Sequence, residues 1–129
     1  KPYEEQRYLE GFFEDLGLEL IAQIQFWMRT NLNSELNLAQ VAAQFGLSQR
    51  SFTRRFKAAT GSRATSYWQQ LRIESAKDLL ASSNLSIQEI AYLVGYHDQG
   101  HLTRLFKQDL ALTPKDYRVM VRKKLFYQE

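Results

Sequence analysis

The sequence predicts an all-α protein, built from two similar helical units and a long helix that joins them. Apolar residues recur close to every 3.6 positions, and no segment alternates polar and apolar residues as a half-buried strand does. The six residues Phe52–Lys57 return about 50 positions later as Leu102–Lys107, with threonine, arginine, phenylalanine and lysine in the same places. A short amphipathic segment ending at a glycine precedes each copy. One supersecondary unit therefore occurs twice, and about seven helices are expected.

The composition is that of a soluble globular protein. Of the 129 residues, 44% are hydrophobic and 24% are charged, and no apolar run approaches the length of about 18 residues that spans a bilayer. The chain has no cysteine, which excludes disulfides and thiolate chemistry. We therefore expect a cytoplasmic protein that has no contact with a membrane.

Charge is distributed unevenly along the chain. Residues 1–20 carry two basic residues and six acidic residues, a net charge of −4. Because the whole chain has a net charge of +3, residues 21–129 carry +7. A net positive charge of this size favours a polyanionic partner, although proteins that bind no charged partner also carry such an excess.

The first unit is predicted over residues 16–63, after an acidic lead-in or linker at residues 1–15. Its helices are expected at about Leu18–Asn31, Leu38–Phe45 and Ser48–Thr60. Asn37 is the expected N-cap of the second of these helices, and Gln40, three residues later, completes a capping box. Gly61 suits the left-handed backbone conformation that closes a helix.

A linking helix is predicted within residues 64–83, and the second unit over residues 84–126. The linking helix is expected to bury five apolar residues: Trp68, Leu71, Ala76, Leu79 and Leu80. In the second unit, helices are expected from about Ser86 to Val94, from Asp98 to Leu110 and from Thr113 onward. Ser86 and Glu89 form another capping box, and Pro114 suits the first position of the last helix.

The repeated unit has the spacing of a helix-turn-helix. Counting Leu38 as the first position, Ala42 is fifth, Gly46 ninth and Phe52 fifteenth. The small alanine lets two helices cross closely, and the glycine suits the turn between them. Ala91 and Gly95 hold the same places in the second copy. The sequence thus predicts two helix-turn-helix subdomains.

The second helix of each unit carries a polar face that periodicity places opposite its phenylalanine. In the first copy this face is Arg50, Thr53, Arg54 and Lys57; in the second it is Gly100, Thr103, Arg104 and Lys107, with Gln99 and His101 beside it. Arginine pairs two donors with guanine, glutamine pairs with adenine, and threonine offers a methyl to thymine. The alternative is that these are ordinary solvated faces, but recurrence of the same polar set weakens it.

The length of the linking helix suits two contacts on one duplex. About 18 residues at 1.5 Å each give roughly 27 Å, comparable to the 34 Å turn of B-DNA. We therefore expect the two recognition helices to enter successive major grooves. Because the copies differ in sequence, the DNA site is expected to be asymmetric.

The segment from about residue 38 to 122 resembles the DNA-binding domain of the AraC/XylS family of bacterial transcription regulators. The motifs that carry the resemblance are Ala42-x-x-x-Gly46-Leu47-Ser48, Phe52-x-Arg54-x-Phe56-Lys57, Thr60-Gly61, Leu71-Arg72-x-x-x-Ala76, Ile90-Ala91-x-x-x-Gly95-Tyr96 and Thr113-Pro114-x-x-Tyr117-Arg118. The sequence of residues 48–57 is also similar to that of a branch of this family whose members carry an N-terminal glutamine-amidotransferase-like sensor domain.

The resemblance implies functional roles for two sets of residues. Those implied to contact bases are Arg50, Thr53, Arg54, Gln99, Thr103 and Arg104. Those implied to contact phosphates are Ser48, Gln49, Lys57, His101 and Lys107. The chain departs from the family pattern at Ala64, where proline is usual, and at Ala111, where glycine usually ends the helix. Gly100, expected in a helix interior at a cost of roughly 1 kcal/mol, makes the second unit the weaker reader.

The resemblance also implies that RNA polymerase is a partner. The main alternative function is a helical protein-interaction module, which contacts the transcription machinery without reading bases. His97 and His101 are four residues apart and could share a helix face, but no third ligand accompanies them, so no metal or other cofactor is expected. The chain offers no nucleophile or phosphate loop, so no enzyme activity is expected. We expect the isolated domain to be monomeric and to be the C-terminal piece of a longer regulator, which can dimerise through a domain absent here.

Overall fold

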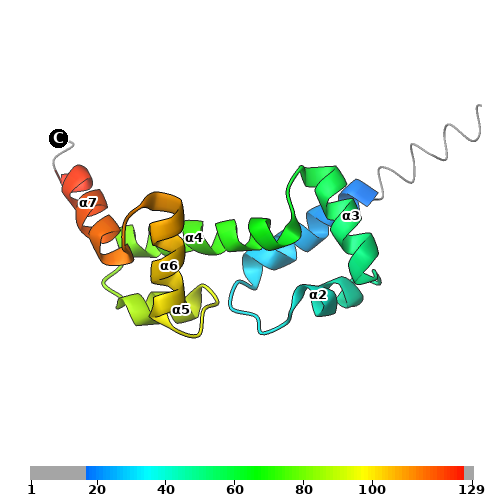
Figure 1. Cartoon of the computed structure of the whole chain (residues 1–129), viewed down its shortest axis with the longest axis horizontal. Coiled ribbons are helices and arrows are strands. Elements are labelled where there is room, and N and C mark those ends of the chain that lie inside the picture. The colour runs from blue at the N-terminus through cyan, green and yellow to red at the C-terminus, as the bar shows by residue number, and fades with distance from the viewer. Residues whose placement is uncertain (1–16, 127–129) are drawn as a thin grey trace, which may run out of the picture. The chain divides into compact units, whose positions relative to one another are not determined.

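The computed structural model describes residues 17–126, and over this range the chain forms seven helices and no strand. One helix covers residues 17–30. The others are α2 (Leu38–Gln44), α3 (Gln49–Thr60), α4 (Ala64–Ser82), α5 (Ile87–Leu93), α6 (Gln99–Leu110) and α7 (Pro114–Phe126) (Figure 1). The all-α prediction is confirmed. The acidic lead-in at residues 1–15 lies outside the described residues.

The chain divides into two compact units. The described residues of unit 1 are 17–31 and 36–67, and those of unit 2 are 32–35 and 68–126. The boundary thus falls inside α4, which is one continuous helix. In unit 1, α2 packs on α3; in unit 2, α5 packs on α6, and α6 on α7.

Side-chain caps start the helices where the sequence predicts them. Asn37 Oδ1 accepts from the backbone N–H of Gln40 (2.8 Å), and the Gln40 side chain accepts from the N–H of Asn37 (2.9 Å). Ser86 and Glu89 make the same reciprocal pair at α5. Each capping box satisfies two helix-end groups and fixes where α2 or α5 begins.

Each unit has its own apolar core, and the same type of aromatic pair occurs within each core. In unit 1 the ring of Phe56 meets the edge of Tyr67 at a centroid distance of 5.3 Å; in unit 2 Phe106 meets Tyr117 in the same way at 5.8 Å. The core of unit 2 combines residues of α4, α5 and α6 with the turn between them: Ile73, Ala76, Leu80, Ile90, Ala91, Val94, Tyr96, Leu102, Leu105 and Phe106.

The set of residues that α4 buries differs in part from the predicted one. Trp68, Ala76 and Leu80 are buried, as predicted, but Leu71 and Leu79 are only half-buried. Ile73, which the sequence analysis missed, is 1% exposed. The reason is that Ile73, Ala76 and Leu80 fall at i, i+3 and i+7 on one face of α4, and Leu71 and Leu79 lie off that face.

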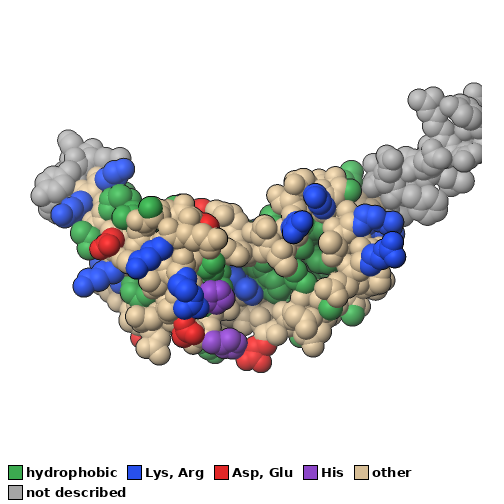
Figure 2. Space-filling model, viewed as in Figure 1, with side chains coloured by type: hydrophobic (Ala, Val, Ile, Leu, Met, Phe, Trp, Pro, Cys, Tyr) green, Lys and Arg blue, Asp and Glu red, His purple; other side chains and the backbone are tan. Residues whose placement is uncertain are grey.

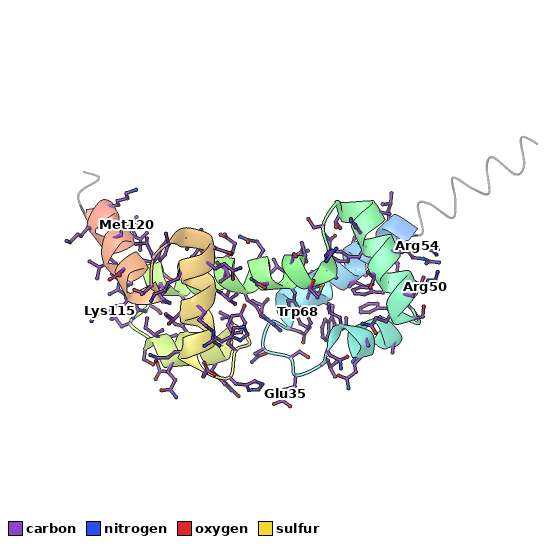
Figure 3. All side chains as sticks on the ribbon, viewed as in Figure 1. Glu35, Arg50, Arg54, Trp68, Lys115 and Met120 are labelled. Atoms are coloured by element: carbon purple, nitrogen blue, oxygen red, sulfur yellow. The ribbon has the colours of Figure 1, made fainter. Side chains whose placement is uncertain are left out.

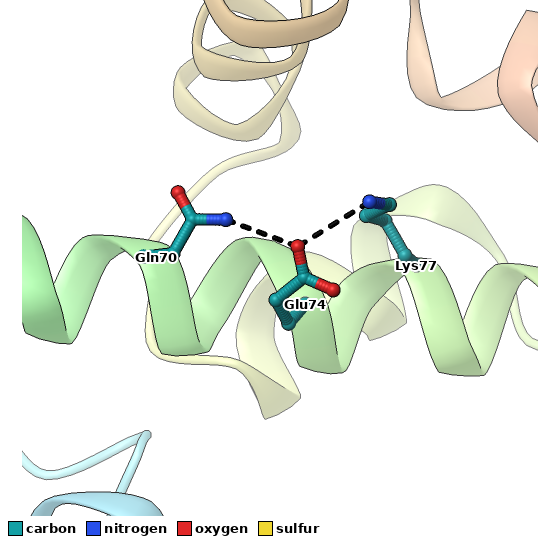
Figure 4. Close-up of polar contacts among 3 residues, drawn as sticks. All are labelled: Gln70, Glu74 and Lys77. Carbon is teal, nitrogen blue, oxygen red and sulfur yellow. Dashed lines mark hydrogen bonds and ion pairs between the residues drawn. The ribbon is translucent and has the colours of Figure 1, made fainter.

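The solvent-facing side of α4 carries a small polar network within unit 2 (Figure 4). Glu74 Oε1 accepts from Gln70 Nε2 at 3.0 Å and forms an ion pair with Lys77 Nζ at 3.3 Å. Exposed pairs one helical turn apart contribute only about 0.3–0.5 kcal/mol. The network therefore keeps this face soluble more than it stabilises the unit.

Two arginines of α7 bind the carbonyl oxygens at the C-terminus of α4. Arg118 Nε donates to the carbonyl of Leu80 at 3.1 Å, and its Nη2 donates to the carbonyl of Ser83 at 3.2 Å. Arg122 Nη2 donates to the same Ser83 carbonyl. Burial and the nearby Arg122 lower the pKa of Arg118, but a guanidinium remains protonated in proteins. These bonds complement the negative end of the α4 dipole.

Ala111 holds a backbone conformation that glycine usually provides. It ends α6 with φ 58°, as Gly61 ends α3 with φ 78°. Only Gly adopts this left-handed region without steric cost, and an L-residue loses about 1–2 kcal/mol there. The helix boundary is therefore kept despite the substitution, at a cost to stability.

We predict that Ala111→Gly stabilises the domain by about 1 kcal/mol, because the strain disappears while the cap remains. Gly61→Ala, the reverse change at the equivalent place, should destabilise it by a similar amount. Thermal unfolding followed by circular dichroism measures both. A lower melting temperature for Ala111→Gly would contradict the strain assignment.

The two turn glycines differ in how closely they are packed. Both have positive φ, 74° at Gly46 and 107° at Gly95. An added Cβ at Gly46 meets no atom within 4 Å. At Gly95 it would collide with the carbonyl oxygen of Leu32 and lie 2.8 Å from Arg72 Nε. Of these two turns, only the one at Gly95 has no room for a Cβ atom.

Gly95→Ala should therefore be the more damaging of two formally identical substitutions. We expect Gly46→Ala to cost about 1–2 kcal/mol from backbone strain, and Gly95→Ala roughly 2–5 kcal/mol, because overpacking adds to the strain. Chemical denaturation of the two variants gives the comparison. Equal losses would show that the Leu32 contact does not constrain the turn.

Candidate nucleic-acid interface

The outer face of α3 brings the predicted residues of the first copy together. Phe52 and Phe56 are 1% and 0% exposed, and this burial turns the opposite side of the helix outward. All of the predicted residues on that side are exposed: Ser48, Gln49, Arg50, Thr53, Arg54 and Lys57. Figure 3 shows Arg50 and Arg54 on the outer side of α3. Gln49, Arg50, Thr53 and Arg54 together line a shallow hollow in the surface.

This face is positively charged and uncompensated. No acid occurs in α3, and within residues 17–126 neither Arg50 nor Arg54 has an acidic ion-pair partner. Lys and Arg side chains gather at the outer side of α3 (Figure 2). Ser48 caps the helix by accepting from the N–H of Ser51 at 3.1 Å. First-turn N–H groups have no partner within a helix, so this end also suits an anion.

The outer face of α6 is narrower than that of α3. Four of its predicted residues are exposed, as their proposed roles require: Gln99, His101, Arg104 and Lys107. Thr103 is half-buried, whereas the equivalent Thr53 of α3 is exposed. Leu105 is buried at the position where α3 has the exposed Arg55. The structure therefore gathers the same residue types in both copies, but presents fewer of them on α6.

The expected position of Gly100 in a helix interior is wrong, because it is the second residue of α6. A Cβ at Gly100 would lie 3.1 Å from Asp98 Oδ1 and 3.6 Å from Arg104 Nη1. Asp98 uses this oxygen to cap the helix, accepting from the N–H of His101 at 2.8 Å. Glycine thus leaves room for both the cap and the Arg104 guanidinium, at a smaller cost than in a helix interior.

One supporting residue of the second copy was missed by sequence reasoning. Tyr96, in the turn before α6, is 5% exposed, and its ring lies 4.6 Å from the ring of His101. Tyr96 was expected only as part of the motif Ile90-Ala91-x-x-x-Gly95-Tyr96. An aromatic residue directly after the turn glycine, five positions before a histidine, was the available signal.

The described part of the chain shows no sign of a metal centre. No group of three or more His, Cys, Asp or Glu side chains within residues 17–126 is arranged to hold a metal ion. Over the same residues, no helix combines the length and the apolar character that crossing a membrane requires.

A family model described as a helix-turn-helix domain matches residues 41–120. Among curated proteins, the MmsAB operon regulatory protein of Pseudomonas aeruginosa is 38% identical over 96 residues, which are 74% of this chain and 31% of that protein. The HTH-type transcriptional activator RhaS of Escherichia coli is 36% identical over 92 residues, 71% of this chain and 33% of RhaS. The chain thus spans about a third of the length of these relatives.

Solved structures share the helical fold of this chain. The DNA-binding domain of AdpA, a global transcriptional factor, in complex with a target DNA aligns with a TM-score of 0.78 and 28% identity, covering 83% of this chain and 96% of that one. The C-terminal domain of AraT, a response regulator from Geobacillus stearothermophilus, aligns with a TM-score of 0.75 and 27% identity, covering 78% and 84%.

Proposed function

Because the chain belongs to the AraC family of helix-turn-helix DNA-binding domains, we propose that it is the sequence-specific double-stranded DNA-binding part of a bacterial transcription regulator. The observation that carries the proposal is the duplicated polar face. Two helices in equivalent places of two units expose arginine, lysine and further hydrogen-bonding side chains, and each buries its aromatic side.

In the first unit, Arg50, Thr53 and Arg54 read base edges in a major groove. A major groove about 12 Å wide admits one α-helix, and arginine pairs with guanine through two hydrogen bonds. Support comes from the exposure of these residues around one hollow and from the absence of an acidic partner for either arginine within the described range. Ser48 and Gln49 at the helix start, and Lys57 one turn beyond Arg54, contact phosphates.

In the second unit, Gln99, Thr103 and Arg104 read bases, and His101 and Lys107 contact phosphates. Gly100 stands where the first copy has Arg50, so this unit offers one reader fewer. The two recognition helices take successive major grooves, and the unequal readers select an asymmetric site. Residues 16–63 and 84–126 act as the two reading subdomains, with the helix of residues 64–83 between them.

The complete regulator is longer than this chain, as its relatives are. The similarity of residues 48–57 to one branch of the family favours a glutamine-amidotransferase-like sensor as the additional domain. This DNA-binding part acts as a monomer in isolation, and the sensor domain supplies any dimerisation. The whole protein works in the cytoplasm, where its bound form recruits RNA polymerase. The named relatives are regulators, which favours a function without catalysis.

A second candidate is a protein-interaction module that contacts the transcription machinery without reading bases. It is favoured by α7, where Val119, Met120 and Leu125 are 47%, 38% and 58% exposed beside Lys123 and Lys124. Exposed apolar side chains are typical of protein contacts and contribute little to phosphate binding.

Selection of bound sequences from a random duplex pool tests base reading. We expect an asymmetric site, and Arg54→Ala should weaken binding to it by about 1–3 kcal/mol and relax the preference at one base pair. Lys57→Ala is the matched control, because a phosphate contact should weaken binding to all sequences alike. An unchanged base preference in Arg54→Ala would remove Arg54 from the readers.

Salt separates the two candidate functions. Neutralised phosphates release counterions, so the affinity for the selected duplex should fall roughly 100-fold between about 50 and about 200 mM salt. Lys57→Ala should reduce the slope of log affinity against log salt by about 1. Titrations by fluorescence anisotropy give both values. An affinity that salt leaves unchanged would favour the apolar protein interface instead.

A further inference from the structure

A row of side chains in contact with one another leads from α4 to the start of α6 within unit 2. The Arg72 guanidinium lies 4.4 Å from the centroid of the Trp68 ring and 5.6 Å from that of the Tyr96 ring. The Tyr96 ring in turn lies 4.6 Å from the His101 ring, at an interplanar angle of 55°. His101 is exposed in the first turn of α6, whereas Trp68 and Tyr96 are buried.

The buried end of the row is held in place. Arg72 Nε donates to the carbonyl of Leu32 at 3.1 Å, and Gly95 packs against the same two groups. Burial raises the pKa of Tyr96 above its usual range, the Arg72 guanidinium opposes this rise, and Asp109 adds to it. The phenol is therefore neutral at physiological pH, and its ring stays between a fixed cation and the histidine.

The backbone of His101 is fixed as well. Its N–H donates to Asp98 Oδ1 at 2.8 Å in the N-cap of α6. Both the main chain and the ring of this residue thus have a defined position, although the side chain faces solvent.

The first copy lacks this row and serves as an internal comparison. Leu47 follows Gly46 where Tyr96 follows Gly95, and Ser51 stands at the position of His101. A helix-turn-helix of this kind therefore folds without an aromatic ring after its turn glycine. The ring in the second copy packs in the core of unit 2 and, in addition, contacts the exposed His101, for which the first copy has no counterpart.

We propose that Tyr96, braced by Arg72, is a positioning residue for DNA binding, which holds the His101 imidazole against the DNA backbone before the duplex arrives. The inference rests on the proposed function and assigns a role to residues that do not themselves touch DNA. Ordering a free side chain at an interface reduces affinity, and a preordered ring avoids most of that loss, equivalent to about 3- to 10-fold in affinity. This gain in affinity compensates in part for the base contact that Gly100, which has no side chain, does not make.

The test is a double-mutant cycle on the full chain with the selected duplex. Tyr96→Leu introduces the residue of the first copy, and it is measured with His101 present and in the His101→Ala background. We expect a loss of about 3- to 10-fold with His101 present and less than about 2-fold without it. Tyr96→Phe keeps the ring and should bind within about 2-fold of the unchanged chain.

Tyr117→Leu is the matched control for a structural effect, because Tyr117 contacts Phe106 in the core of the same unit. Any loss of DNA affinity in Tyr117→Leu should be the same with His101 present and in the His101→Ala background. Where Tyr96→Leu fails to fold by circular dichroism, Arg72→Lys takes its place, since it keeps the charge but loses the planar group that stacks on the ring.

Three outcomes are distinct. Losses that depend on His101, with rescue by Tyr96→Phe, support the positioning role. Equal losses in both backgrounds, or a Tyr96→Phe variant as weak as Tyr96→Leu, overturn it while the proposed function stands. An unchanged chain that shows no preference among duplexes overturns the proposed function itself.

Discussion

Burial of one aromatic side of α3 and of α6 is the constraint on which the rest of the molecule depends. Phe52 and Phe56 in one unit, and Leu102 and Phe106 in the other, are at most 1% exposed. Because a helix turns once every 3.6 residues, their burial determines which side chains face outward. The neighbouring helices are arranged around these residues, and the polar faces follow from them.

The internal repeat extends beyond the helix-turn-helix pairs. Ile21, Ile24 and Met28 of helix 17–30 have the spacing of Ile73, Ala76 and Leu80 in α4, and all six residues are buried. At the other end, Tyr67 of α4 packs on Phe56 as Tyr117 of α7 packs on Phe106. The first part of α4 therefore completes one copy, and its second part opens the next. This double use explains why the unit boundary falls between Tyr67 and Trp68.

Local chemistry explains how much was predictable. The caps at Asn37 and Ser86 act over three residues, so a single sequence reveals them, and the helix ends were predicted to within a residue or two. Other contacts of unit 2 act over long separations. Arg72 binds a carbonyl 40 residues away, and Arg118 one 38 residues away, so sequence spacing gave no sign of them. Gly100 was predicted in a helix interior, although a helix that begins at about Asp98 makes it a first-turn residue.

The inequality of the two copies has a consequence for orientation. Two identical recognition surfaces related by a twofold axis would bind a palindromic site equally well in either direction. Here Arg50 faces outward on one helix and Gly100 takes its place on the other, so the chain has a distinguishable head and tail. A single bound molecule would then mark a polarity on the duplex. Any protein surface it presents would point consistently upstream or downstream, without a second subunit to set the direction.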